Sequence, residues 1–165
     1  MISDNAFNWL MKSLTKNRSD SNNYVFDTET NTLFAYTIED NILLPWFRNP
    51  FIKIDETVKK FEKELNRVSE GCNFIISLPC LSFEDKREFL NSFIAKIDSN
   101  LTREKLIENL KDFDEYSPFW FSDTVKNIDN DLYRLFERSK WQFIAQKIKE
   151  MYEPLGISED TTVLY

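Results

Sequence analysis

The sequence predicts an α+β fold: an N-terminal helix, a small antiparallel sheet of about three to four strands, and a mostly helical C-terminal half. Three observations predict it. The segments that predict strands lie within residues 24–78, whereas the second half repeats its apolar residues at helical spacing. The 165 residues include only two Gly and five Pro, which is unlike a loop-rich chain. Strands followed by a run of helices are typical of this class.

The first elements are a helix and a hairpin. Ser3 is an expected N-cap, and the apolar residues after it fall at i, i+3, i+4 and i+7. Two β-rich runs, residues 24–27 and 33–38, flank a polar linker and predict a hairpin. The linker lacks Gly, but Asn31 tolerates the left-handed conformation that a tight turn requires.

Residues 39–79 are expected to alternate between irregular and regular structure. Pro45 and Pro50 disfavour a long helix, so a short strand and an irregular segment are predicted there. Asp55 is an expected cap of a helix that stops near Gly71. Residues 74–78 then predict a buried strand that is closed by Pro79.

The second half predicts four helices. Ser82 caps the first, Thr102 starts the second, Ser117-Pro118 opens the third, and Asp129 or Asp131 opens the longest. Pro154 and Gly156 end the last helix. We predict a single domain over residues 1–157 and a C-terminal tail over residues 158–165.

Charge and cysteine content restrict the setting in which the protein works. The formal charge of −7 disfavours broad contact with nucleic acid, which requires clustered Lys and Arg, and suits a basic partner or solubility. Cys72 and Cys80 flank a predicted strand that keeps them apart, so both are expected to be buried free thiols of a reducing compartment. The sequence shows neither a signal peptide nor an apolar run long enough to span a membrane. We therefore expect a cytoplasmic protein.

The residue types that usually perform catalysis are scarce. The chain has no His, which excludes Ser-His-Asp and Cys-His arrangements and the commonest metal ligand. With two Cys and no His, a structural zinc site would need carboxylates to complete it, which is rare, and no Gly-rich loop matches a phosphate-binding motif. We expect no cofactor and no bound metal.

One short motif offers a catalytic alternative. Residues 25–30 resemble the first motif of proofreading 3′–5′ exonucleases, in which Asp and Glu one residue apart hold two divalent metals. Asp27 and Glu29 are therefore the candidate catalytic residues. The remaining motifs of that family are absent. The family has a His, or in a variant a Tyr, four residues before its last Asp. This chain has no His, and the residue four positions after Tyr133 is Glu137 rather than Asp. The favoured interpretation is a hairpin with a polar turn.

Three other residues are candidates for contact with a partner. Trp46 and Arg48 lie in an aromatic segment, and Trp120 lies in a second dense aromatic cluster. Most aromatic residues of such clusters belong in a core. Those that do not face inward are typical anchors of protein–protein interfaces.

The order of segments resembles the uncharacterised bacterial protein family UPF0158. The run Tyr24 to Asn31 is similar to that family's Tyr-hydrophobic-Asp-Thr-Glu-Thr hairpin. An acidic helix over residues 55–69, a strand ending in Pro79 and a helix over residues 82–97 follow in the same order. A long helix that ends in Gly156-Ile157 completes the pattern. The chain departs from the family at residues 114–120, where the family has a Gly- and Arg-rich stretch.

The resemblance implies a fold and a bacterial source, but no activity. The primary hypothesis is a non-enzymatic cytosolic binding or regulatory protein that acts through protein–protein contacts. One alternative is an acidic inhibitor or immunity-type protein that binds a basic toxin or nuclease. A metal-dependent, exonuclease-like enzyme that uses Asp27 and Glu29 is the other alternative.

Overall fold

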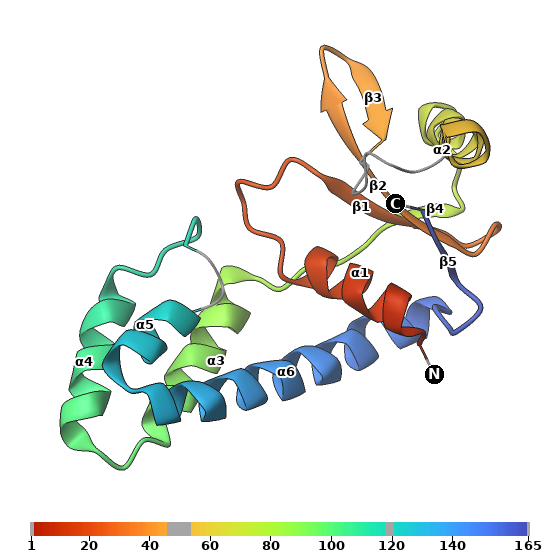
Figure 1. Cartoon of the computed structure of the whole chain (residues 1–165). Coiled ribbons are helices and arrows are strands. Elements are labelled where there is room, and N and C mark those ends of the chain that lie inside the picture. The colour runs from red at the N-terminus through yellow and green to blue at the C-terminus, as the bar shows by residue number, and fades with distance from the viewer. Residues whose placement is uncertain (1, 46–53, 118–120, 165) are drawn as a thin grey trace. The chain divides into compact units, whose positions relative to one another are not determined.

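The computed structural model describes residues 2–45, 54–117 and 121–164 (Figure 1). By its contacts the chain divides into two compact units. Unit 1 contains residues 1–14, 20–79 and 148–165, and unit 2 contains residues 15–19 and 80–147. Each unit is described by itself. Compact units of this size can belong to one domain, so a single domain over residues 1–157 stays a prediction.

Unit 1 is built on a five-stranded sheet. Its strands are β1 (Asn23–Asp27), β2 (Thr32–Glu39), β3 (Ile42–Pro45), β4 (Ile75–Ser77) and β5 (Thr162–Val163). The order β3-β2-β1-β4 is antiparallel throughout, and β5 adds to β2 in parallel. The predicted fold class is confirmed: in the described residues, a small, mainly antiparallel sheet is combined with six α-helices.

Two tight turns without glycine shape the sheet. Asn31 has φ 50° in the β1–β2 turn, which confirms the predicted left-handed conformation. In the β2–β3 turn, Asp40 and Asn41 both have positive φ, at 50° and 64°. Positive φ at both central residues matches the right-handed twist of the strands that such a turn joins.

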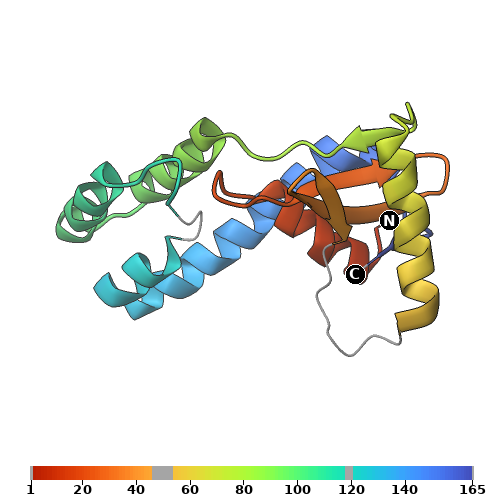
Figure 2. The same cartoon turned by 90° about the horizontal axis from the view of Figure 1, so that it is seen from above.

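Side-chain alternation along the strands divides unit 1 into layers. On one face, Val25 and Phe34 pack with Phe61 of α2 (Ile54–Ser69). On the other face, the ring of Tyr24 meets Trp9 of α1 (Asp4–Leu14) edge-on, with ring centroids 5.2 Å apart. Tyr24–Asp27 of β1 and Thr32–Ala35 of β2 are therefore buried on both sides (Figure 2).

Unit 2 is helical. It contains α3 (Phe83–Ala95), α4 (Asn100–Lys111), α5 (Ser122–Ile128) and most of α6 (Asn130–Tyr152), whose residues from Ile148 onward count with unit 1. A short 3-10 turn over Glu153–Leu155 follows α6. The core of unit 2 is a continuous cluster of large apolar side chains: Leu90, Phe93, Ile94, Ile97, Leu106, Leu110, Phe113, Phe121, Val125 and Phe136.

Three of the predicted helix caps are confirmed and two predictions are wrong: the Ser3 hydroxyl accepts the amide of Ala6 at the start of α1, but Asp55 lies inside α2, which begins at Ile54. Ser82 and Asp85 form a reciprocal capping box at the start of α3. Asp129 accepts hydrogen bonds from two amides in the first turn of α6. The second helix, however, begins at Asn100 with Ser99 as its cap rather than at Thr102. The predicted start at Ser117-Pro118 falls partly on residues outside the described ranges.

Two further predictions are corrected. Residues 158–165 are not simply a tail, because Thr162 and Val163 form β5 and Leu164 is buried. Two paired residues are too few to produce a periodic pattern in the sequence. Cys72 and Cys80 are free as predicted, but Cys72 is only half-buried and Cys80 is exposed. Cys72 precedes β4 and Cys80 follows it, so neither side chain lies on the sheet.

In the described ranges, no helix has the length and apolar character needed to cross a membrane.

Candidate functional site

The carboxylate of Asp27 is fully buried at the end of β1, where the chain turns into the hairpin. Its Oδ1 accepts hydrogen bonds from the amides of Glu29 and Thr30, at 2.9 and 3.2 Å. This is the local arrangement by which Asp stabilises a turn. Half of the acidic pair that the nuclease hypothesis invokes therefore holds the turn together.

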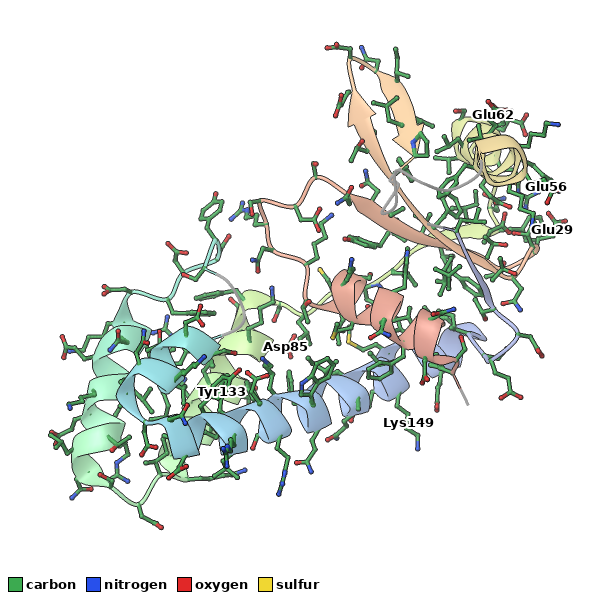
Figure 3. The ribbon with its side chains drawn as sticks, viewed as in Figure 1. Glu29, Glu56, Glu62, Asp85, Tyr133 and Lys149 are labelled. Carbon is green, nitrogen blue, oxygen red and sulfur yellow. The ribbon has the colours of Figure 1, made fainter. Side chains whose placement is uncertain are left out.

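Arg67 of α2 joins both acids of the motif. Its Nε donates to Asp27 Oδ2 at 2.6 Å, and its Nη2 donates to Asp27 Oδ1 at 3.2 Å. Nη2 also donates to Glu29 Oε2 at 2.5 Å. Figure 3 shows Glu29 at the end of the hairpin beside α2. Two parallel bonds to one carboxylate are the strong, directional form of an Arg–Asp pair.

Glu64 completes the cluster from the same face of α2. It is almost fully buried, and its Oε1 accepts a hydrogen bond from the Thr30 hydroxyl at 3.1 Å. Its Oε2 is buried 3.8 Å from Arg67 Nε, too far for a hydrogen bond. Burial raises the pKa of Glu64 above its ordinary value of 4.5, and a hydrogen bond with Asp27 and the negative charge of Asp27 raise it further.

Asp27 shifts in the opposite direction. Burial alone would raise its pKa, but the hydrogen bonds from Arg67 and from the amides of Thr30 and Glu29 together lower it below 3.8. The pair therefore divides its charge: Asp27 is ionised, and Glu64 retains a proton to higher pH. Arg67 is held as a cation by Asp27 and Glu29, which raise its pKa.

This arrangement gives the Asp-Thr-Glu-Thr motif a structural role: it forms the hairpin turn and connects that turn to α2. Asp27 organises the turn, and Arg67 ties the turn to α2. The guanidinium bridges the two carboxylates that the nuclease hypothesis assigns to metals. Within residues 2–45, 54–117 and 121–164, no group of three or more Cys, Asp or Glu side chains is placed to hold a metal ion.

The sequence analysis did not single out Glu64 or Arg67. Both lie next to the apolar stripe of α2 that contains Phe61, Leu65 and Val68. Charged residues beside the apolar stripe of a helix are usually exposed, so the pattern did not mark Arg67 as having a buried partner. That partner is 40 residues away from Arg67 in sequence, so only the fold brings the two together.

A second polar cluster lies in unit 2. Lys140 is buried on α6 and donates to Glu137 Oε1 at 2.5 Å and to Ser122 Oγ at 3.0 Å. The Ser122 hydroxyl itself donates to Glu137 at 2.6 Å. Because the Lys is neutralised by Glu137 and the Ser is a donor to the same carboxylate, the cluster links α5 to α6 rather than activating the hydroxyl.

The predicted partner-binding residues Trp46, Arg48 and Trp120 lie outside the described residues. A different exposed surface lies on the β2–β3 hairpin (residues 32–45), where β2 extends past the end of β1 and, of the strands in the described ranges, pairs only with β3 over Thr37–Glu39. Ile38, Ile42 and Leu44 of this hairpin are 58%, 60% and 36% exposed. The sequence did not predict that these side chains are exposed, because the same apolar residues also fit a buried strand.

Comparison of the chain with protein-family models, with curated proteins and with solved structures finds no match.

Proposed function

We propose that this chain is a non-enzymatic binding or regulatory protein that acts through protein–protein contacts, with the β2–β3 hairpin as its contact element. The observation that carries the proposal is the exposure of Ile38, Ile42 and Leu44 on one projecting hairpin. By the strand register, Ile42 and Leu44 lie on one face of the hairpin and Ile38 lies on the other, and large aliphatic side chains exposed side by side, as Ile42 and Leu44 are, mark interaction sites.

The backbone of the hairpin suggests how a partner would bind. Among the described residues, β3 pairs with β2 and with no other strand, so its second edge has no strand partner, although α2 also contacts β3. Such an edge accepts an extended segment as an additional strand, and alternate side chains supply the specificity. Ile42 and Leu44 have the same parity along β3 and would contact apolar residues of the added strand together.

The charge of the hairpin suggests the composition of the partner. Residues 32–45 include Glu39 and Asp40 but no Lys or Arg, and the whole chain carries −7. Both acids are exposed at the tip of the hairpin. We therefore infer an extended, basic partner segment that alternates Lys or Arg with apolar residues.

The same acidity supports the second candidate function, an acidic inhibitor or immunity-type protein that binds a basic toxin or nuclease. The two functions differ in how strongly affinity depends on salt. An inhibitor held mainly by charge would lose most of its affinity as ionic strength rises, whereas strand addition by apolar contact would retain it. We further propose a cytoplasmic protein of the bacterial family UPF0158, on the order of segments in the sequence.

A defined peptide tests the contact element directly. The probe is an eight-residue peptide that alternates Lys with Val and is N-methylated along one edge, so that it cannot pair with itself. We expect it to bind the intact chain, as measured by calorimetry. The double variant Ile42→Lys and Leu44→Lys should bind it at least about tenfold more weakly, because edge lysines prevent strand addition.

Two controls make the result interpretable. Ile107→Lys places the same charge on an exposed apolar position of α4 and should leave peptide affinity unchanged. A peptide with Glu in place of Lys should bind more weakly, because its charge is repelled by the acidic tip of the hairpin. Equal affinity of the wild-type chain and the double variant for the Lys peptide would refute the hairpin as the contact element.

A further inference from the structure

The part of α6 that belongs to unit 2 exposes a side with two Arg, one Leu and one Trp. Arg134 and Arg138 are both exposed, and Leu135 and Trp141 are 54% and 44% exposed. At 3.6 residues per turn, Arg134, Arg138 and Trp141 fall on one side of the helix. Leu135 lies beside Arg138, three residues before it. We call these four residues the α6 face.

The α6 face is positive although the whole chain carries −7. Residues 132–147 contain four basic residues and one acid, Glu137, whose carboxylate already accepts a hydrogen bond from Lys140. Within the described residues, no carboxylate pairs with the guanidinium of Arg134 or of Arg138. The two guanidinium groups start about 6 Å apart along the helix axis, and each can donate two parallel hydrogen bonds to a carboxylate.

The residue types of the α6 face are those of protein–protein interfaces. Trp and Arg are enriched among the residues that contribute most to binding, and they are most effective where apolar surface excludes water from the contact. Trp141 is not part of the apolar cluster that forms the core of unit 2. Together with Leu135, it supplies apolar surface next to the two cations.

We propose that the α6 face binds an acidic amphipathic helix of another protein. Two Glu side chains one turn apart on that helix would meet Arg134 and Arg138, because both helices repeat their side chains at the same spacing. Apolar residues on the same side of the partner helix would cover Trp141 and Leu135. This second contact surface prefers a charge opposite to that preferred by the hairpin of unit 1, so either proposal can fail without the other.

Two other anionic occupants fit the α6 face less well. Tight binding to nucleic acid requires many contacts to phosphates, whereas this face supplies two Arg in an acidic chain. A helix that lies on a membrane has a broad apolar side, whereas the apolar residues here are one Leu and one Trp. Nucleic acid and anionic lipid are therefore included as competing outcomes of the test.

A designed helix tests the α6 face on the intact chain. The probe is a fluorescent helical peptide of Ala and Gln, with two Glu four positions apart and Leu residues on the same side; fluorescence anisotropy measures its binding. The double variant Arg134→Glu and Arg138→Glu should bind it at least about tenfold more weakly, and Trp141→Ala should also weaken binding. The control variant Lys105→Glu and Lys111→Glu makes the same change in net charge at exposed positions of α4 and should change affinity by less than about twofold.

Three further probes identify the occupant. A peptide with Ser in place of Leu keeps the charge but should bind at least about tenfold more weakly, because the apolar contact is lost. A single-stranded oligonucleotide and vesicles that contain phosphatidylserine should both bind more weakly than the Leu peptide. The substituted side chains are exposed, so circular dichroism should show that every variant is folded. Equal affinity of the wild-type chain and the Arg double variant for the Leu peptide would overturn the proposal, as would tighter, Arg-dependent binding of the oligonucleotide or the vesicles.

Discussion

Arg67 and Asp27 form a two-bond ion pair between α2 and the end of β1, with Nε–Oδ2 and Nη2–Oδ1 distances of 2.6 and 3.2 Å. Asp27 is fully buried, and the Arg67 side chain is 17% exposed. The pair fastens the hairpin turn to the helix that covers the sheet. In the pair, each buried charge compensates the other. Removing one partner leaves the other charge buried and uncompensated, which destabilises the fold more than removing both.

Removing one member of this pair should destabilise the fold strongly. We expect Asp27→Asn or Arg67→Met to lower the free energy of unfolding by about 3 kcal/mol, because each leaves a buried charge without its partner. Urea unfolding followed by circular dichroism measures this loss. The double variant should lose clearly less than the sum of the two single losses. Glu29→Gln, whose side chain is half-exposed, should cost less than about 1 kcal/mol; a comparable loss there would contradict the assignment.

Glu64 should make stability fall as the pH rises. Its pKa is raised in the folded state by burial and by Asp27, so its contribution is complete below pH 4.5 and is lost as the pH passes the raised value. Glu64→Gln preserves the acceptor for Thr30 and has no proton to lose. The stability of Glu64→Gln relative to wild type should therefore increase from pH 5 to pH 9. A relative stability that does not change with pH would show that Glu64 is ionised throughout.

The last strand should contribute to the core of unit 1. Leu164 is buried against Val25, Phe34 and Phe61, and its amide donates to the carbonyl of Leu33 at 2.9 Å. We expect Leu164→Ala to cost about 2–4 kcal/mol of unfolding free energy. Glu159→Ala, at an exposed position a few residues earlier, should change stability by less than about 0.5 kcal/mol. Thermal melts of the two variants compare them directly.

The nuclease hypothesis makes a prediction that an assay decides. It requires Mg²⁺- or Mn²⁺-dependent cleavage of single-stranded DNA that is lost in Glu29→Gln, a variant that should remain folded. Because Arg67 bridges Asp27 and Glu29, we expect no metal-dependent cleavage by the wild-type chain. Cleavage that follows the metal and disappears in Glu29→Gln would restore the hypothesis.

The capping box of α3 offers a test in unit 2. Ser82 Oγ accepts the amide of Asp85, and the Asp85 carboxylate accepts the amide of Ser82, both at 3.0 Å. Ser82→Ala should cost about 1 kcal/mol, whereas Ser82→Asn, another good cap, should cost much less. Equal losses in both variants would mean that the cap contributes little to this helix. The comparison comes from the urea concentrations at the midpoints of unfolding, provided that the dependence of the unfolding free energy on urea is the same in all variants.

The sequence predicts the features that depend on neighbouring residues. Asn31 lies in the left-handed region and Ser82 caps its helix, because turn and cap preferences act over only a few positions. The fold class also follows, since periodicity distinguishes strands from helices. In the candidate site, the same local reasoning identifies Asp27 as a turn residue.

Features that depend on distant residues could not be predicted in this way. Arg67 meets Asp27 only because α2 packs over β1, and no local signal encodes that contact. Thr162 and Val163 form a strand only because β2 offers an edge to them. The exposure of Cys80 depends on where β4 ends rather than on its own neighbours. Each case is set by tertiary packing, which overrides local preference.

The three-segment make-up of unit 1 has a consequence for how the molecule matures. During synthesis, residues 80–147 leave the ribosome before β5 exists, so the helical unit can collapse while the sheet still lacks its parallel strand. Thr161 then reaches back to Asn31, where its hydroxyl donates to the Asn side chain at 2.8 Å. The sheet is thus completed by residues that are translated after the helical unit, and a nascent chain halted before residue 161 would expose the partly built sheet to chaperones.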